Sequence, residues 1–141
     1  VDVFISSPFK RAMDTIKPLA VSRNSKIELI SEFQERKISD GWIDDFSDFS
    51  KKQWQDFDYK LPHGESLNEV QERNIKRLME ILNQHTEKLI VIGTHGTALS
   101  MIINHFDRSF NHQGFNKVKN KMPWIVKMTF DGMTLLGMER E

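Results

Sequence analysis

Short apolar runs separated by longer amphipathic stretches divide the chain into alternating strands and helices. The runs at residues 3–5, 27–30 and 89–92 predict three short strands. The last run, Leu-Ile-Val-Ile, has no polar member, which is typical of a strand covered on both faces. The stretches between these runs are long enough for helices, so the pattern predicts an alternating α/β domain.

Helix-start signals stand at three places. Ser7 and Pro8 predict a helix over residues 8–20, with the hydroxyl as N-cap and proline at the first helical position. Ser66 and Glu69 form a capping box, and apolar residues then recur at helical spacing. Residues 97–105 predict a further helix after Gly-Thr-His-Gly interrupts the apolar run.

Residues 31–62 show no sustained period, and we interpret them as a long excursion with one short helix near residues 46–57. Trp42, Phe46 and Trp54 lie in this excursion. These aromatic side chains either shape a lid over a site or pack the excursion onto the body of the domain, and we favour packing. After a loop, residues 124–130 and 133–138 predict a hairpin joined by Asp131-Gly132.

These elements predict one domain over residues 1–141: a three-layer α/β/α fold with a mostly parallel sheet, helices on both faces and a C-terminal β-hairpin. Lys plus Arg and Asp plus Glu each number 20, so no charge excess points to nucleic acid or to an anionic membrane. The absence of cysteine excludes disulfides, thiolate metal sites and a cysteine nucleophile. Every apolar run is too short to span a bilayer, and a cytoplasmic location is the simplest expectation.

The carboxyl ends of the three parallel strands are where a ligand should bind. There we expect Arg11, an acid from the Glu32 and Glu35 region, and His95, to which the helix start could add Glu65. Positive groups, helix N-terminal amides and a carboxylic acid suit a phosphoryl group and the protonation of its leaving alcohol. His95, with glycines nearby for close backbone approach, is either a phosphate ligand or a partly buried histidine that caps its strand. No carboxylate–histidine spacing resembles a metal-ligand set, and no cofactor is implied.

Three motifs occur in order at suitable separations: residues 6–15 (Ser-Ser-Pro-Phe-Lys-Arg-Ala-Met-Asp-Thr), residues 64–66 (Gly-Glu-Ser) and residues 94–100 (Thr-His-Gly-Thr-Ala-Leu-Ser). Together they resemble the histidine phosphatase superfamily, which includes phosphoglycerate mutases and many small phosphatases. The resemblance implies a histidine nucleophile that takes the phosphoryl group, and a phosphohistidine that water or a substrate hydroxyl resolves.

The resemblance also implies residue roles. Arg11 would grip the phosphate, His95 would stabilise phosphoryl charge as the family's second histidine, and Glu35 would donate the proton, with Glu32 as the alternative. The substrate-binding residues it implies are Arg11, Ser7, His95, Gly96 and Thr97.

The family's nucleophile lies in an Arg-His-Gly motif at the end of a first strand, and no such motif precedes Val1. We therefore expect an N-terminally truncated domain that lacks roughly forty to sixty residues, including a central strand. Such a chain would expose two unpaired sheet edges and be inactive, unstable, or completed by another chain or a homo-oligomer.

The remaining histidines and one basic run invite other interpretations. His63 precedes Gly-Glu-Ser, but Pro62 stands where the arginine of a nucleophile motif belongs, so we do not expect His63 to be catalytic. His85, His105 and His112 have no motif partners and are expected at the surface. The basic run at residues 117–121 is expected to be a solvated face rather than a substrate site.

A phosphomonoesterase acting on a small phosphate ester is the function we expect, for two reasons. The excursion is short for a mutase, and Arg36 is followed by Lys-Ile-Ser rather than by the His-Tyr-Gly that resembles mutases. Phosphoglycerate mutase is the nearest alternative. A non-catalytic phospho-ligand-binding pseudoenzyme is the other.

Overall fold

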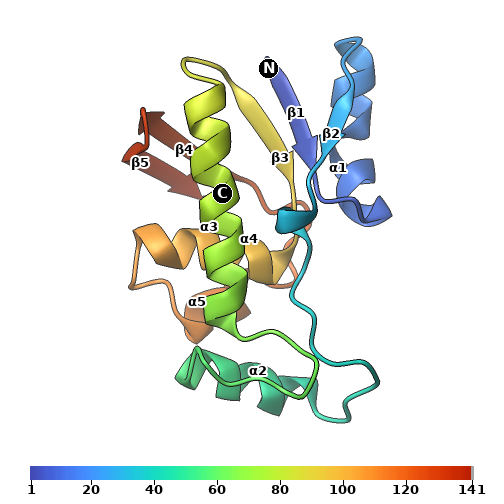
Figure 1. Cartoon of the computed structure of the whole chain (residues 1–141), viewed down its shortest axis with the longest axis vertical. Coiled ribbons are helices and arrows are strands. Elements are labelled where there is room, and N and C mark those ends of the chain that lie inside the picture. Colours follow the sequence, from blue (N-terminus) through green and yellow to red (C-terminus); the bar gives the residue numbers. More distant parts are fainter. Residues whose placement is uncertain (141) are drawn as a thin grey trace.

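A computed structural model, which describes residues 1–140, has a three-stranded parallel sheet at its centre (Figure 1). The strands are β1 (Val3–Ser6), β2 (Ile27–Leu29) and β3 (Ile90–Gly93), in the order β2-β1-β3. In this register Ile5 lies between Glu28 and Ile92. All three strands were predicted from the apolar runs, with their ends moved by one residue.

Helices cover both faces of this sheet, as predicted. Helix α1 (Lys10–Ser22) contacts all three strands and buries Ala12, Ile16 and Ala20. On the other face, α3 (Leu67–Gln84) and α4 (Gly96–Phe106) bury Leu78 and Ile102 in one cluster with Ile5. The fold is therefore a three-layer α/β domain.

The predicted start of the first helix is wrong. Helix α1 begins at Lys10, its N-cap is Phe9, and no side chain caps it. The chain is still paired to the sheet at Ser7, whose amide donates to the Gly93 carbonyl across 2.9 Å. The Ser7 hydroxyl is buried at the site described below instead of serving as the N-cap.

The capping box of α3 is confirmed. Ser66 Oγ accepts from the Glu69 amide, and Glu69 Oε1 accepts from the Ser66 amide, both at 3.1 Å. These two bonds satisfy donors that a helix start otherwise leaves free. They place Glu65, the residue before the cap, at the edge of the pocket.

The excursion holds a short 3₁₀ turn, η1 (Ser31–Phe33), and helix α2 (Phe46–Gln55), close to the predicted short helix. The packing prediction is correct for Trp54, which is buried in a cluster with Phe110 and Phe115. It is wrong for Trp42, which is 90% exposed because it lies in the irregular loop before α2. It is also wrong for Phe46, which is exposed, although its ring lies beside the Arg36 guanidinium.

The C-terminal hairpin is confirmed as β4 (Val126–Asp131) and β5 (Thr134–Arg140), an antiparallel pair turned at Gly132, which has a φ of 60°. Before it lies α5 (His112–Val118), where a loop was predicted; a helix of seven residues is too short to show a helical period in the sequence. The lysines at its end, Lys117, Lys119 and Lys121, are exposed.

Four strand edges have no strand partner within residues 1–140: the outer edges of β2, β3, β4 and β5. β3 pairs only with β1, and β4 pairs only with β5, in a separate two-stranded sheet. The prediction that β3 is fully covered is wrong, since Ile90, Val91 and Ile92 are each only half-buried. β3 is half-buried because it is one of the two edge strands of its sheet.

Candidate active site

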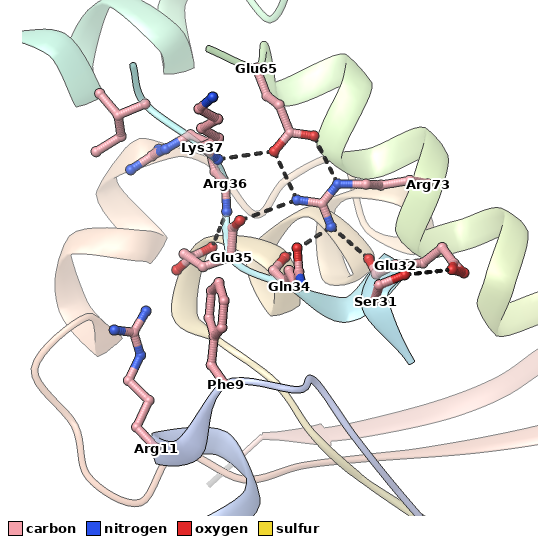
Figure 2. A pocket seen from close by; sticks show the side chains of 11 residues that line it. Phe9, Arg11, Ser31, Glu32, Gln34, Glu35, Arg36, Lys37, Glu65 and Arg73 are labelled. Atoms are coloured by element: carbon pink, nitrogen blue, oxygen red, sulfur yellow. Dashed lines mark hydrogen bonds and ion pairs between the residues drawn. The ribbon is translucent and has the colours of Figure 1, made fainter. Parts of the chain in front are cut away.

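Three segments that are distant in sequence meet at the carboxyl ends of β1 and β3. The β1–α1 connection contributes Ser7 and Arg11, the excursion contributes Glu35, and the β3–α4 connection contributes His95. An open pocket of about 670 Å³ lies beside them, lined by residues that include Arg11, Glu35 and Arg73. Figure 2 shows Arg11 and Phe9 rising from the start of α1, with Glu35 facing Phe9.

His95 is only 7% exposed, and both of its ring nitrogens have partners. Arg11 donates its Nε–H to His95 Nδ1 across 3.3 Å, and His95 Nε2 lies 2.8 Å from Ser7 Oγ. Because a guanidinium can only donate, Nδ1 must be an acceptor, and the neutral ring then donates from Nε2 to Ser7. The edge of the Phe9 ring packs against the imidazole with centroids 5.3 Å apart.

The surroundings of His95 favour this neutral form. Burial lowers its pKa below the ordinary imidazole value, the nearby Glu35 carboxylate raises it, and the Arg11 and Arg73 cations lower it further. The net direction is downward. In the absence of a bound anion the ring is therefore set up to donate one hydrogen bond rather than to carry a charge.

The Glu35 carboxylate lies at the N-terminus of α4, the helix that begins at Gly96, directly after His95. Its two oxygens accept from the Thr97 and Ala98 amides, each at 3.0 Å, and Oε1 also accepts from the Arg36 amide at 2.9 Å. A carboxylate is stabilised there by free backbone donors and by the helix dipole. The Thr97 amide, which we expected to hold phosphate, thus holds Glu35 instead.

The alternative acid, Glu32, lies elsewhere on the pocket rim. Its carboxylate accepts from Ser31 Oγ at 3.2 Å and lies 3.8 Å from Arg77 Nε. Among the described residues it makes no hydrogen bond or ion pair with α4. The geometry brings Glu35, and not Glu32, to the helix that begins after His95.

Glu65, a further acid predicted at this site, is engaged in an ion pair. Arg73 meets it with two hydrogen bonds of 2.9 and 3.0 Å, and the Lys37 amide donates to Oε1 at 2.9 Å. Burial raises the Glu65 pKa, but these donors outweigh burial and hold it below its usual range. Arg73 was missed because only the fold shows that its partners, eight and about forty residues away, converge on it.

The two glycines near His95 differ in what they permit. A Cβ on Gly93 would lie 2.7 Å from the Ala12 carbonyl oxygen, so Gly93 lets β3 approach α1. A Cβ on Gly96 would meet only Phe115, at 3.9 Å. The absence of a side chain at Gly93 therefore lets the strand pack closely against α1. At Gly96, by contrast, there is room for a side chain.

The other histidines lie apart from these residues. His63 is exposed, with Nδ1 3.8 Å from an Asp40 oxygen. His85, His105 and His112 are half-buried rather than at the open surface as predicted, and His112 stacks on Trp54. Among residues 1–140 no group of three acids or histidines is arranged to hold a metal ion, and no helix is long and apolar enough to cross a membrane.

Solved structures with the same fold include several phosphatases. YhfR of Bacillus stearothermophilus aligns with 96% of this chain and 71% of its own, with a TM-score of 0.71 and 19% identity. A mycobacterial glucosyl-3-phosphoglycerate phosphatase in complex with inorganic phosphate aligns over 73% of this chain and 57% of its own (TM-score 0.62, 17% identity). The α-ribazole phosphatase of Shigella flexneri aligns over 74% and 55% (TM-score 0.56, 21% identity).

The chain thus spans just over half the length of these last two phosphatases. No curated protein matches it. The family model described as histidine phosphatase superfamily, branch 1, matches residues 1–136, nearly the whole length and all three motifs. The chain belongs to branch 1 of the histidine phosphatase superfamily.

Proposed function

We propose that this chain carries the charge-stabilising part of a phosphomonoesterase active site. The observation that supports the proposal is the trio of Arg11, His95 and Ser7, in which a cation that lines the pocket meets a buried imidazole. Among residues 1–140 no acceptor is bonded to the Nη groups of Arg11, so they are available to a phosphate. The fold neighbours that are phosphatases support the same reaction class.

In the proposed reaction a histidine nitrogen attacks phosphorus and the bond from phosphorus to the ester oxygen breaks. Arg11 stabilises charge on the phosphoryl oxygens together with His95, whose Nδ1 takes up a proton once Arg11 turns to the phosphate, and Glu35 gives its proton to the leaving alkoxide. Water then attacks the phosphohistidine, gives a proton back to Glu35 and releases inorganic phosphate and the free histidine. Before the first step Glu35 must leave the Thr97 and Ala98 amides, which then become available to the phosphate.

The nucleophile itself is the part we do not assign within this sequence. None of its five histidines follows an arginine and precedes a glycine. We therefore propose that the 141-residue chain is inactive alone and that an Arg-His-Gly strand pairs with the free edges of β3 or β4. A cytoplasmic location also remains a proposal.

Three measurements on the 141-residue chain test the function. The 141-residue chain should bind inorganic phosphate yet release no p-nitrophenol from p-nitrophenyl phosphate and form no phosphohistidine. Turnover that survives His95→Ala but disappears in His63→Ala would overturn the assignment. The coding sequence upstream of Val1 should be read for Arg-His-Gly, and a product that carries it should hydrolyse phosphate esters.

A mutase and a pseudoenzyme remain as rival proposals. The same longer product, given 3-phosphoglycerate, should release phosphate, and efficient isomerisation to 2-phosphoglycerate would instead identify a mutase. Phosphate binding in a chain for which no Arg-His-Gly segment is encoded would favour a pseudoenzyme.

A further inference from the structure

We propose that Arg73 is a positioning residue that fixes Glu35 at the start of α4. The proposal rests on the proposed function, because it concerns the acid of that reaction. Arg73 belongs to α3, does not touch His95 by hydrogen bond, and acts through the backbone of the excursion (Figure 2).

All five N–H donors of Arg73 are used. Nε and one Nη2 hydrogen go to the Glu65 carboxylate. The others go to three backbone carbonyls of the excursion: Glu32 at 2.5 Å, Gln34 at 2.8 Å and Glu35 at 3.3 Å. Only a planar guanidinium offers five donors in a fixed fork, and a lysine ammonium has three.

The excursion needs these donors because residues 34–37 form no helix or strand. Among the described residues the Gln34 and Glu35 carbonyls accept from no backbone amide, and a carbonyl shielded from water without a partner is costly. Glu65 holds the end of this segment at Lys37 with two hydrogen bonds. Its amide donates to the Lys37 carbonyl at 2.8 Å, and its carboxylate accepts from the Lys37 amide at 2.9 Å. The pair of Arg73 and Glu65 therefore fastens the backbone from residue 32 to residue 37.

Glu35 is held from two sides by this arrangement. Its carbonyl accepts from Arg73, and its carboxylate accepts from Thr97 and Ala98. The bond from Arg73 fixes the position of the Glu35 backbone, and the bonds from the two amides fix the position of its carboxylate. If Arg73 loses its fork, the Glu35 backbone is free to drift, and the carboxylate should spend less time on the two amides.

Hydrogen exchange of the Thr97 and Ala98 amides in the 141-residue chain measures this directly, without any turnover. Arg73→Lys keeps the charge and removes the fork. We expect exchange of these two amides to rise about tenfold, the effect of losing a charge-assisted hydrogen bond, while the middle of α4 and β5 keep their protection. Arg77→Lys, one turn along the same helix, is the matched control, because Arg77 pairs with the Glu80 side chain at 2.7 Å and should leave both amides unchanged.

A double-mutant cycle separates positioning from general stability. In a Glu35→Ala background the two amides already lack their acceptor, so adding Arg73→Lys should change their exchange no further. If Arg73→Lys does not fold, Glu65→Gln removes the ion pair with little change in volume and should give the same local effect. Unchanged exchange at Thr97 and Ala98 in a folded variant, or an equal rise along the whole chain, would overturn the proposal.

The two proposals fail separately. If the exchange result is local but a product with an Arg-His-Gly segment has no phosphatase activity, the positioning role stands and the function does not. If that product hydrolyses esters and Arg73→Lys lowers neither kcat nor amide protection, the function stands and the positioning role does not. A fall of about tenfold in kcat with little change in KM is the expected kinetic result. The Arg73 bond to the Glu35 carbonyl anchors the backbone from which the carboxyl group, once it has left the amides, must reach the leaving oxygen.

Discussion

Arg11 donates to Nδ1 of His95 across 3.3 Å, and this contact decides which imidazole nitrogen carries the proton. The proton is left on Nε2, which lies 2.8 Å from Ser7 Oγ. A phosphate that draws Arg11 away would free Nδ1 to take up a second proton. Binding of an anion and protonation of His95 are therefore coupled through Arg11.

Arg11→Met should weaken binding of inorganic phosphate about tenfold or more, because a hydrogen bond to a charged group contributes about 1.5–3 kcal/mol. It should also raise the pKa of His95, since the Arg11 cation lowers it. Titration of the His95 ring by NMR, with and without phosphate, measures both effects. Lys10→Met removes the same charge one residue earlier, where the lysine pairs with Asp14 at the exposed surface, and should change neither.

The stability of the chain should fall as the pH drops below the ordinary imidazole pKa of about 6.5. Burial holds the pKa of His95 below that value, so in this range the unfolded chain binds the proton more readily than the folded chain. Stability should thus be highest above about pH 6.5 and decrease toward the folded pKa. Urea unfolding of wild type and His95→Gln between about pH 5 and pH 7.5 measures this.

His95→Gln should show a smaller loss of stability on acidification than the wild type. Some loss should remain, because burial also lowers the pKa values of His105 and His112. Equal slopes in the two proteins would show that His95 is not the group responsible.

The sequence predicted the fold well wherever local signals act alone. The capping box at Ser66 and the Asp131-Gly132 turn depend on neighbouring residues, and both are present. The start of α1 was misplaced because Ser7 has two possible uses, as an N-cap or as a partner of a histidine 88 residues away. Only the tertiary contact decides between them.

The site was predicted less completely than the fold. Motif positions brought Arg11, Glu35 and His95 to one place, and the structure puts them there. Two features lie outside what a motif records: the Glu35 carboxylate on the α4 amides, and the fork of Arg73 on backbone carbonyls. Both depend on the path of an irregular segment, and the periodicity of a sequence carries no information about such a path.

Glu35→Gln should destabilise the chain by about 1–2 kcal/mol. The variant loses the negative charge at the start of α4 and one of the two hydrogen bonds that the carboxylate accepts from the α4 backbone amides. Glu32→Gln is the matched control and should change stability by less than about 0.5 kcal/mol, since its carboxylate is half-exposed and weakly paired. Urea unfolding at neutral pH compares them. In a product with the nucleophile, kcat should fall about 10²–10⁴-fold for the first variant only. Equal losses in the two variants would mean that Glu35 has no special role.

Gly64→Ala should destabilise the chain by about 1–3 kcal/mol through overpacking. A Cβ at Gly64 would lie 2.0 Å from the Ile38 carbonyl oxygen, so the two backbone segments must separate. These are the segments that Lys37 and Glu65 join, so the strain should pass to Glu35 and speed exchange of the Thr97 and Ala98 amides.

Gly41→Ala is the matched control for this last variant, because nothing lies within 4 Å of a Cβ at Gly41. It should be neutral or slightly stabilising, since alanine restricts the unfolded chain more than glycine does. Urea unfolding measures the stability of the two variants, and hydrogen exchange measures the protection of the Thr97 and Ala98 amides in each. Destabilisation by Gly64→Ala without faster exchange at Thr97 and Ala98 would mean that the contact between residues 37–38 and 64–65 supports the fold alone. Faster exchange at those two amides would show that the same contact also holds the acid in place.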